Sequence, residues 1–222
     1  MIWVFLITAV LVITHLASSH IGKRLDRAKH AAHSFGGGMA IAYGFLHLLP
    51  ELEKGHRVFG HSVHLVALCG FILFYVAEHW AENHPSPHVD FKFRILLHSI
   101  YNWLIIYSLP EAIEEGLGYA LLLSITLTLH LLSSDYHLRS INPIQFHAWG
   151  RWALAAALVA GFITDIFQEP VIPQVADTWT ALLSGFVLSN VFRNESPDHK
   201  TGQLVWFLAG ALLYSAISMA VD

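Results

Sequence analysis

The chain consists almost entirely of long apolar stretches separated by short polar segments, and this pattern constrains its fold more than any other feature. A helix needs about 20 apolar residues to cross the hydrocarbon core of a bilayer. Charged residues make up 13% of the chain, against about 25% in soluble proteins. The sequence therefore predicts an all-α, polytopic membrane protein, with residues 1–222 forming one bundle and a single domain. The eight predicted spans are 2–19, 35–49, 64–80, 93–110, 118–135, 148–167, 176–192 and 204–221.

The distribution of Lys and Arg predicts the orientation of this bundle. The segments after the first, third, fifth and seventh spans hold ten of the 12 Lys and Arg residues, counting Arg94 and Arg151 with the loops they border. Because Lys and Arg gather on the cytoplasmic side, both chain ends are expected outside. The first span has no preceding positive charge, unlike a signal peptide. We expect a multi-pass protein of a cell membrane, such as a bacterial inner membrane.

Histidine is abundant, with 16 residues, and two predicted spans carry it deep inside. In the fourth span His98 and Asn102 are four residues apart and share one helical face. Ionisable groups in hydrocarbon are costly, so they indicate a functional site by default. His130, in the fifth span, is expected at a similar depth to His98. If these spans are neighbours, His98, Asn102, His130 and the Ser134–Asp135 step converge on one cavity.

Two sequence segments resemble those of a known family. The second span contains GGGMAIAYGFLHLLPE (36–51) and the third contains CGFILFYVAEH (69–79), followed by a loop with histidines. Together with eight spans and both ends outside, these phrases resemble the ZIP family of divalent-metal transporters. The resemblance covers most of the chain. It implies an eight-helix fold and transport of zinc or iron towards the cytoplasm.

In the ZIP family the fourth span carries a His-Asn-x-x-(Asp/Glu)-Gly metal motif. By this resemblance, His98 takes the place of the motif's histidine and Ser99 that of its asparagine. Asn102 stands where the family has a carboxylate. The neutral amide at this position predicts a weaker, degenerate metal site.

The fifth span of the family carries a His-Glu-x-Pro-His-Glu motif. His130 takes the place of its first histidine, Ser134 that of its second, and Asp135 that of its last glutamate. The resemblance thus implies a metal site of His98, Asn102, His130 and Asp135. Two histidines and one carboxylate still provide the three protein ligands that zinc accepts, with water as the fourth.

Three alternatives apply to these residues. His98 and Asn102 could instead form hydrogen bonds that hold helices together. Asp135 could pair with Arg139, four residues on. Asp135 also lies about 140° around a regular helix from His130, at 3.6 residues per turn, so it could miss the cavity.

Further polar residues are candidates for a transport path. At the outer end of the second span, His47 and Glu51 are placed to receive a cation, although hydration of a helix end explains Glu51 equally well. A loop with His79, His84 and His88 could deliver metal on the inner side, or simply be solvated. The secondary path candidates are His47, Glu51, Ser99, Ser134 and Asn190.

The remaining residues add smaller expectations. Glu78 and His79 are predicted to form a pair at the membrane interface, and Pro50 to end the second span. Cys69, the single cysteine, excludes an intrachain disulfide and is predicted to be a buried apolar residue.

Three functions remain open at the level of sequence. The first is a ZIP-like transporter of a divalent transition metal, a non-enzyme with zinc or iron as its substrate. The second is a ZIP-like fold that acts as a metal sensor or scaffold without transport. The third is an intramembrane zinc-dependent hydrolase, which a missing HExxH motif disfavours. The expected partners are the metal ion and the lipid bilayer, and a homodimer fits the pattern. Nucleic acid is not expected, because no basic block is present.

Overall fold

The computed structural model describes residues 1–24, 29–50, 52–53, 60, 62–114, 116–167, 173–195 and 203–221. These residues form helices joined by short turns, and no β-strand occurs among them. The all-α prediction is therefore confirmed. The helices are α1 (Ile2–Arg24), α2 (Lys29–Tyr43), η1 (Gly44–Leu48), α4 (Ser62–Glu82), α5 (Pro87–Tyr107), α6 (Leu109–Glu114), α7 (Leu117–Ile141), α8 (Pro143–Gln145), η2 (Phe146–Gly150), α9 (Arg151–Phe167), α10 (Pro173–Asn190), η3 (Val191–Glu195) and α11 (Leu204–Val221).

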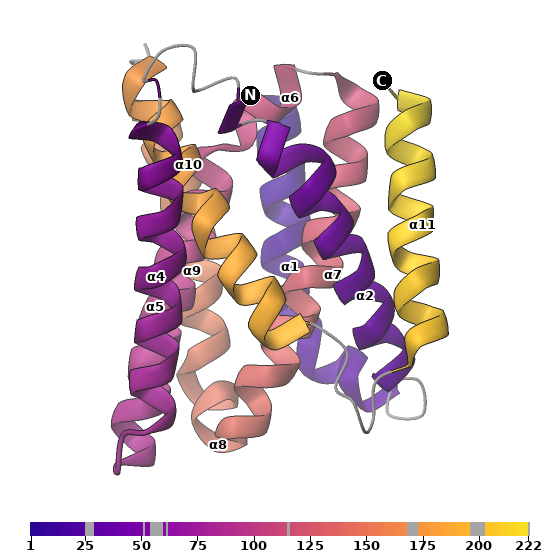
Figure 1. Ribbon diagram of the computed structural model, residues 1–222. Helices are drawn as coiled ribbons and strands as arrows, with labels where there is room; N and C mark the ends of the chain where they lie inside the picture. Colours follow the sequence, from indigo (N-terminus) through magenta and orange to yellow (C-terminus); the bar gives the residue numbers. More distant parts are fainter. Residues whose placement is uncertain are drawn as a thin grey trace.

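The long helices run up and down the bundle, and both chain ends lie at the same end of it (Figure 1). We call this end the terminal face. The opposite end, where α4 finishes and α5 begins, is the α4–α5 face. The π-helices η1 and η3 directly follow α2 and α10, and η2 directly precedes α9. We call each such continuous helical segment a rod.

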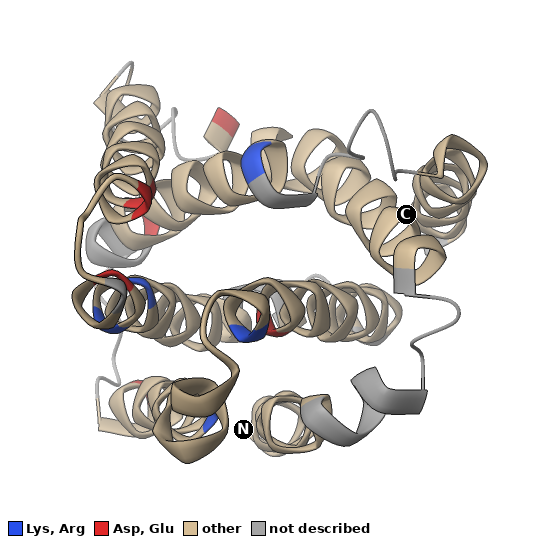
Figure 2. Ribbon diagram, turned by 90° about the horizontal axis from the view of Figure 1, so that it is seen from below, with Lys and Arg blue, Asp and Glu red and all other residues tan. Residues whose placement is uncertain are grey.

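Helices α5 and α7 occupy the middle of the bundle. On one side α5 packs against α9, and α7 against α1; on the other side α5 contacts α4 and α10, while α7 contacts α2 and α11. Seen along the bundle, the helices form layers with this pair between the outer rows (Figure 2). The two segments that the sequence singles out for their histidines are therefore the interior helices.

Glycines set two of the closest helix contacts. A Cβ atom on Gly38 would lie 2.0 Å from the backbone oxygen of Phe207, and one on Gly210 would lie 2.1 Å from that of Phe35. These contacts join α2 to α11. In the same way Gly185 brings α10 against α4, where an added Cβ would lie 2.0 Å from the oxygen of Ala67. Within the glycine triplet 36–38, Gly38 is thus the position where α11 approaches most closely.

The apolar content of the helices is uneven. In the described part of the chain, two helical segments are long and apolar enough to cross a membrane, Ser62–Glu82 and Pro143–Phe167. Two shorter segments, Ile2–Ser18 and Leu204–Ala220, are also apolar. Large apolar side chains cover the outer surfaces of α4 and α11, among them Leu65, Leu73, Leu212 and Met219.

Several helix boundaries differ from the predicted spans. Pro50 does not end the second rod, because η1 and residues 49–50 continue it. The fourth rod begins earlier than predicted, at Pro87, where the fixed proline backbone angle suits a first helical position. The sixth also begins earlier, at Pro143, because the Asn142 side chain accepts a hydrogen bond from the backbone of Gln145. The two early starts depend on a proline at the first helical position, which an apolar pattern does not report.

The prediction for Cys69 is wrong, because its side chain is exposed on α4. It points away from the bundle, on a surface that also carries exposed Leu68 and Ile72. A small apolar residue is accommodated on such a surface as readily as in a core.

Candidate functional site

The four residues proposed from the sequence as metal ligands are all buried inside the bundle. His98 and Asn102 on α5 are 2% and 1% exposed, and His130 and Asp135 on α7 are 3% and 1% exposed. Polar groups buried this deeply need hydrogen-bond partners. Those partners determine what each side chain can do.

Asp135 and Asn102 are joined through a histidine of α1. His15 donates from Nδ1 to Oδ1 of Asp135 at 2.8 Å, and its Nε2 accepts from Nδ2 of Asn102 at 2.9 Å. His15 is itself only 1% exposed. This chain of hydrogen bonds ties α1, α5 and α7 together, which is the interhelical role considered for Asn102.

The alternative pairing of Asp135 with Arg139 is not observed. Arg139 donates instead to the backbone oxygen of Ser18 on α1, at 3.4 Å. The partner of Asp135 is His15, which sequence reasoning missed. Its only signal was a histidine within an apolar segment, the criterion that singled out His98.

His130 faces a different set of neighbours from Asp135. The hydroxyl of Tyr101, on α5, donates to His130 Nε2 at 2.6 Å, and Nδ2 of Asn190, on α10, approaches the same nitrogen at 3.3 Å. Asn190 was a secondary path candidate. The structure therefore joins it to His130, while His130 and Asp135 point towards different helices.

His98 is held by its own helix. Its Nδ1 donates to the backbone oxygen of Arg94, one turn earlier, at 2.9 Å. The other ring nitrogen, Nε2, is buried and has no hydrogen-bond partner among the described residues. A histidine whose Nδ1 donates to a carbonyl keeps a lone pair on Nε2, which is the arrangement of many metal-binding histidines.

A buried ion-pair group lies next to His98. Arg94 pairs with Oε2 of Glu78 on α4, and its Nε donates to Oδ1 of Asp90 at 2.6 Å. Glu78 is fully buried and Arg94 is 2% exposed. Glu78 was predicted to form a pair with His79. Its partner is instead Arg94, and the two side chains neutralise each other inside the bundle.

The predicted ligands do not form one closed coordination set. Within the described residues, no group of three His, Cys, Asp or Glu side chains is arranged to hold a metal ion. Two of the predicted ligands, His98 at Nε2 and Asp135 at Oδ2, have a buried donor atom without a hydrogen-bond partner in that part of the chain.

The other path candidates have separate surroundings. His47 stacks on Tyr119, with ring centroids 4.1 Å apart, near the terminal face. Ser134 is buried, whereas Ser99 is partly exposed. Glu51 lies outside the described residues.

The histidines near the α4–α5 face do not form a cluster with one another. His84 Nδ1 accepts from the backbone of Ser86 at 3.1 Å, and His88 is hydrogen-bonded to Gln145. His79 stacks on Tyr75 within α4. Each ring has its own partner, as expected for the solvated interpretation of this loop.

Comparison with known proteins gave no assignment: no family model matches the chain, and no curated protein matches it. The function is therefore argued from the fold and the site.

Proposed function

We propose that the chain is a multi-pass membrane protein and a ZIP-like transporter that moves a divalent transition metal, zinc or iron, towards the cytoplasm. The long rods cross the bilayer with both chain ends outside, so the α4–α5 face is cytoplasmic. The apolar outer surfaces of α4 and α11 support this arrangement, since Leu73 and Leu212 are 58% and 69% exposed, and extended apolar surfaces mark contacts with lipid or protein.

The metal path runs through the middle of the bundle. Helices α5 and α7 carry buried polar side chains that face each other and the helices around them. Intramembrane polar residues of this kind face a bundle interior and mark ion pathways. His98 and His130 are the ligands on which transport depends, and Asp135 contributes the negative charge.

The observation that carries this proposal is the buried Nε2 of His98, which has no hydrogen-bond partner among the described residues. A buried imidazole that leaves Nε2 without a hydrogen bond loses stability, because an unsatisfied buried polar atom costs about 1–3 kcal/mol. A metal ion that binds Nε2 removes this cost. The hydrogen bond from Nδ1 to Arg94 already fixes the ring and its tautomer for that role.

One observation favours the second function, a ZIP-like metal sensor or scaffold without transport. His15 already occupies one oxygen of Asp135 and the amide of Asn102. If these bonds are permanent, the bundle is locked and the metal site serves binding alone. The transport assay decides between the two functions.

The test is uptake of zinc or iron(II) into proteoliposomes that contain the purified full-length chain. We expect saturable uptake by the wild type and its loss in the double variant His98→Ala/His130→Ala. The matched control is His64→Ala, since His64 is exposed on α4 near the terminal face. Wild-type vesicles that take up neither metal would refute transport, and metal binding retained without flux would identify the sensor.

A further inference from the structure

We propose that Glu78 of α4 is a further metal ligand, which shares the transported cation with His98 and replaces the carboxylate that α5 lacks at Asn102. This inference rests on the proposed metal-handling function. Neither the spacing of the sequence nor the resemblance to ZIP transporters pointed to Glu78 as a ligand.

The side chains of Glu78 and His98 are neighbours, and each has one donor atom without a hydrogen-bond partner among the described residues. Oε1 of Glu78 lies 3.9 Å from the His98 ring, measured to the Nδ1 that binds Arg94. Both residues are more than nine-tenths buried. Oε1 of Glu78 and Nε2 of His98 are each buried without a hydrogen-bond partner among the described residues. Unsatisfied buried acceptors on two neighbouring side chains are unfavourable unless a cation binds them.

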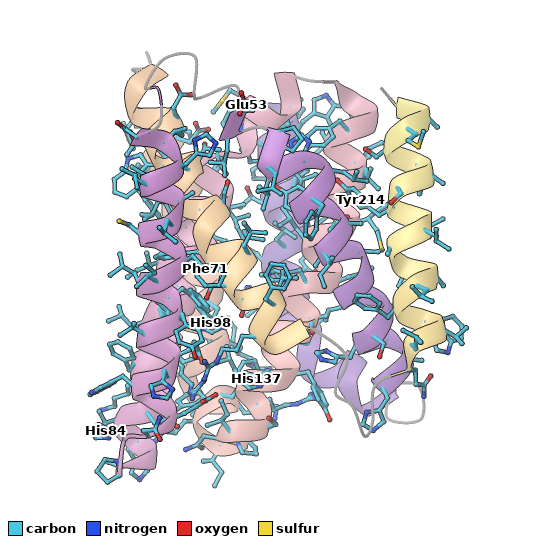
Figure 3. The ribbon with its side chains drawn as sticks, in the orientation of Figure 1. Glu53, Phe71, His84, His98, His137 and Tyr214 are labelled. Atoms are coloured by element: carbon cyan, nitrogen blue, oxygen red, sulfur yellow. The ribbon has the colours of Figure 1, made fainter. Side chains whose placement is uncertain are left out.

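The charge of this group also favours a cation. Glu78, Asp90 and Arg94 carry formal charges of −1, −1 and +1, so the buried ion-pair group sums to −1. A second buried histidine nitrogen without a hydrogen-bond partner among the described residues is Nε2 of His137 on α7. Figure 3 shows His98 and His137 in the same half of the bundle, towards the α4–α5 face.

The contacts of Arg94 allow Glu78 to exchange its ion pair with Arg94 for a bond to the metal. It binds only Oε2 of Glu78 and has a second carboxylate, Asp90, for its Nε. When a metal takes Glu78, Arg94 keeps Asp90 and is not left as an unpaired buried charge, which would be strongly destabilising. Arg94 therefore acts as a built-in competitor that prevents tight capture and promotes release towards the α4–α5 face.

The experiment is a titration of the metal-free full-length chain in lipid nanodiscs with Co²⁺, followed by its ligand-field absorption. Glu78→Gln is expected to weaken Co²⁺ binding at least about tenfold, since even residues that only support a ligand change affinity by 10- to 100-fold. Arg94→Gln removes the competing charge and is expected to tighten binding at least about tenfold. The control is Glu82→Gln, one turn further on α4, because Glu82 is exposed and pairs with Arg193 instead.

A structural role for Glu78 makes the opposite prediction. If Glu78 only neutralises Arg94, the double variant Glu78→Gln/Arg94→Gln, which leaves no unpaired charge at this pair, should bind Co²⁺ as the wild type does. That result, or unchanged affinity in both single variants, or no Co²⁺ binding by the wild type, overturns the inference. If Co²⁺ binds through Glu78 but vesicles show no uptake, the inference stands and the transport proposal fails.

Discussion

The glycine contact between α2 and α11 gives a stability prediction whose size follows from the structure. In Gly38→Ala the new Cβ would lie 2.0 Å from the oxygen of Phe207, whereas ordinary contact begins at 3.4 Å. The helices must therefore separate by about 1.4 Å at this point, and overpacking of this kind costs about 1–3 kcal/mol. Gly36→Ala is the matched control two residues away, because its Cβ would meet Leu129 at 3.6 Å.

Both substitutions gain the same helix propensity, about 1 kcal/mol, so the difference between the variants isolates the clash. A chain of this size changes its Tm by about 2–4 °C per kcal/mol. Gly38→Ala should thus unfold about 2–12 °C below Gly36→Ala in detergent, followed by tryptophan fluorescence. Equal Tm values for the two variants would refute the close packing of α2 against α11.

Two further predictions concern the buried network and the outer surface. Asn102→Leu removes the donor to His15 Nε2 and should lower the free energy of unfolding by about 1–3 kcal/mol, because a buried acceptor loses its partner; denaturation in mixed micelles measures it, and an unchanged midpoint would show that the His15 bond contributes nothing. Cys69, exposed on α4, should resist a water-soluble maleimide in intact vesicles and react after denaturation in detergent, because hydrocarbon disfavours the reactive thiolate; rapid labelling in vesicles would contradict a lipid-facing α4.

The sequence identifies the interior helices but not their connections. Polar residues within apolar segments single out α5 and α7, since such residues are stable only inside a bundle. The pairing of Asp135 with His15 joins residues 120 positions apart, and no local spacing reports it. It depends on the packing of α1 against α7, which the apolar pattern leaves open.

The angular argument for Asp135 is informative for the same reason. Its position about 140° from His130 around the helix predicts that the two side chains point in different directions, and they do. Asp135 is nevertheless buried, because α7 has neighbours on both sides: α1 meets Asp135, while α5 and α10 meet His130. A helix inside a bundle has no solvated face, which a pattern based on one buried face does not anticipate.

The buried ion pair of Glu78 and Arg94 shows a second limit. Residues near the predicted end of a span are normally assigned to the interface, where charges are hydrated. Here α4 and α5 extend beyond the predicted spans, to Glu82 and back to Pro87, and a carboxylate of one helix neutralises the guanidinium of the other. Opposite charges on adjacent helices can therefore be buried as a pair, whereas a single unpaired charge would be stable only at the hydrated interface.

The most direct test of the central claim, that His98 and His130 hold the transported metal, is X-ray absorption at the zinc edge of the loaded full-length chain. We predict two imidazole ligands with Zn–N distances of about 2.0–2.1 Å, and one imidazole in each of His98→Ala and His130→Ala. The exposed variant His64→Ala should retain both. A spectrum without imidazole scattering, or one that neither His98→Ala nor His130→Ala changes, would contradict the account.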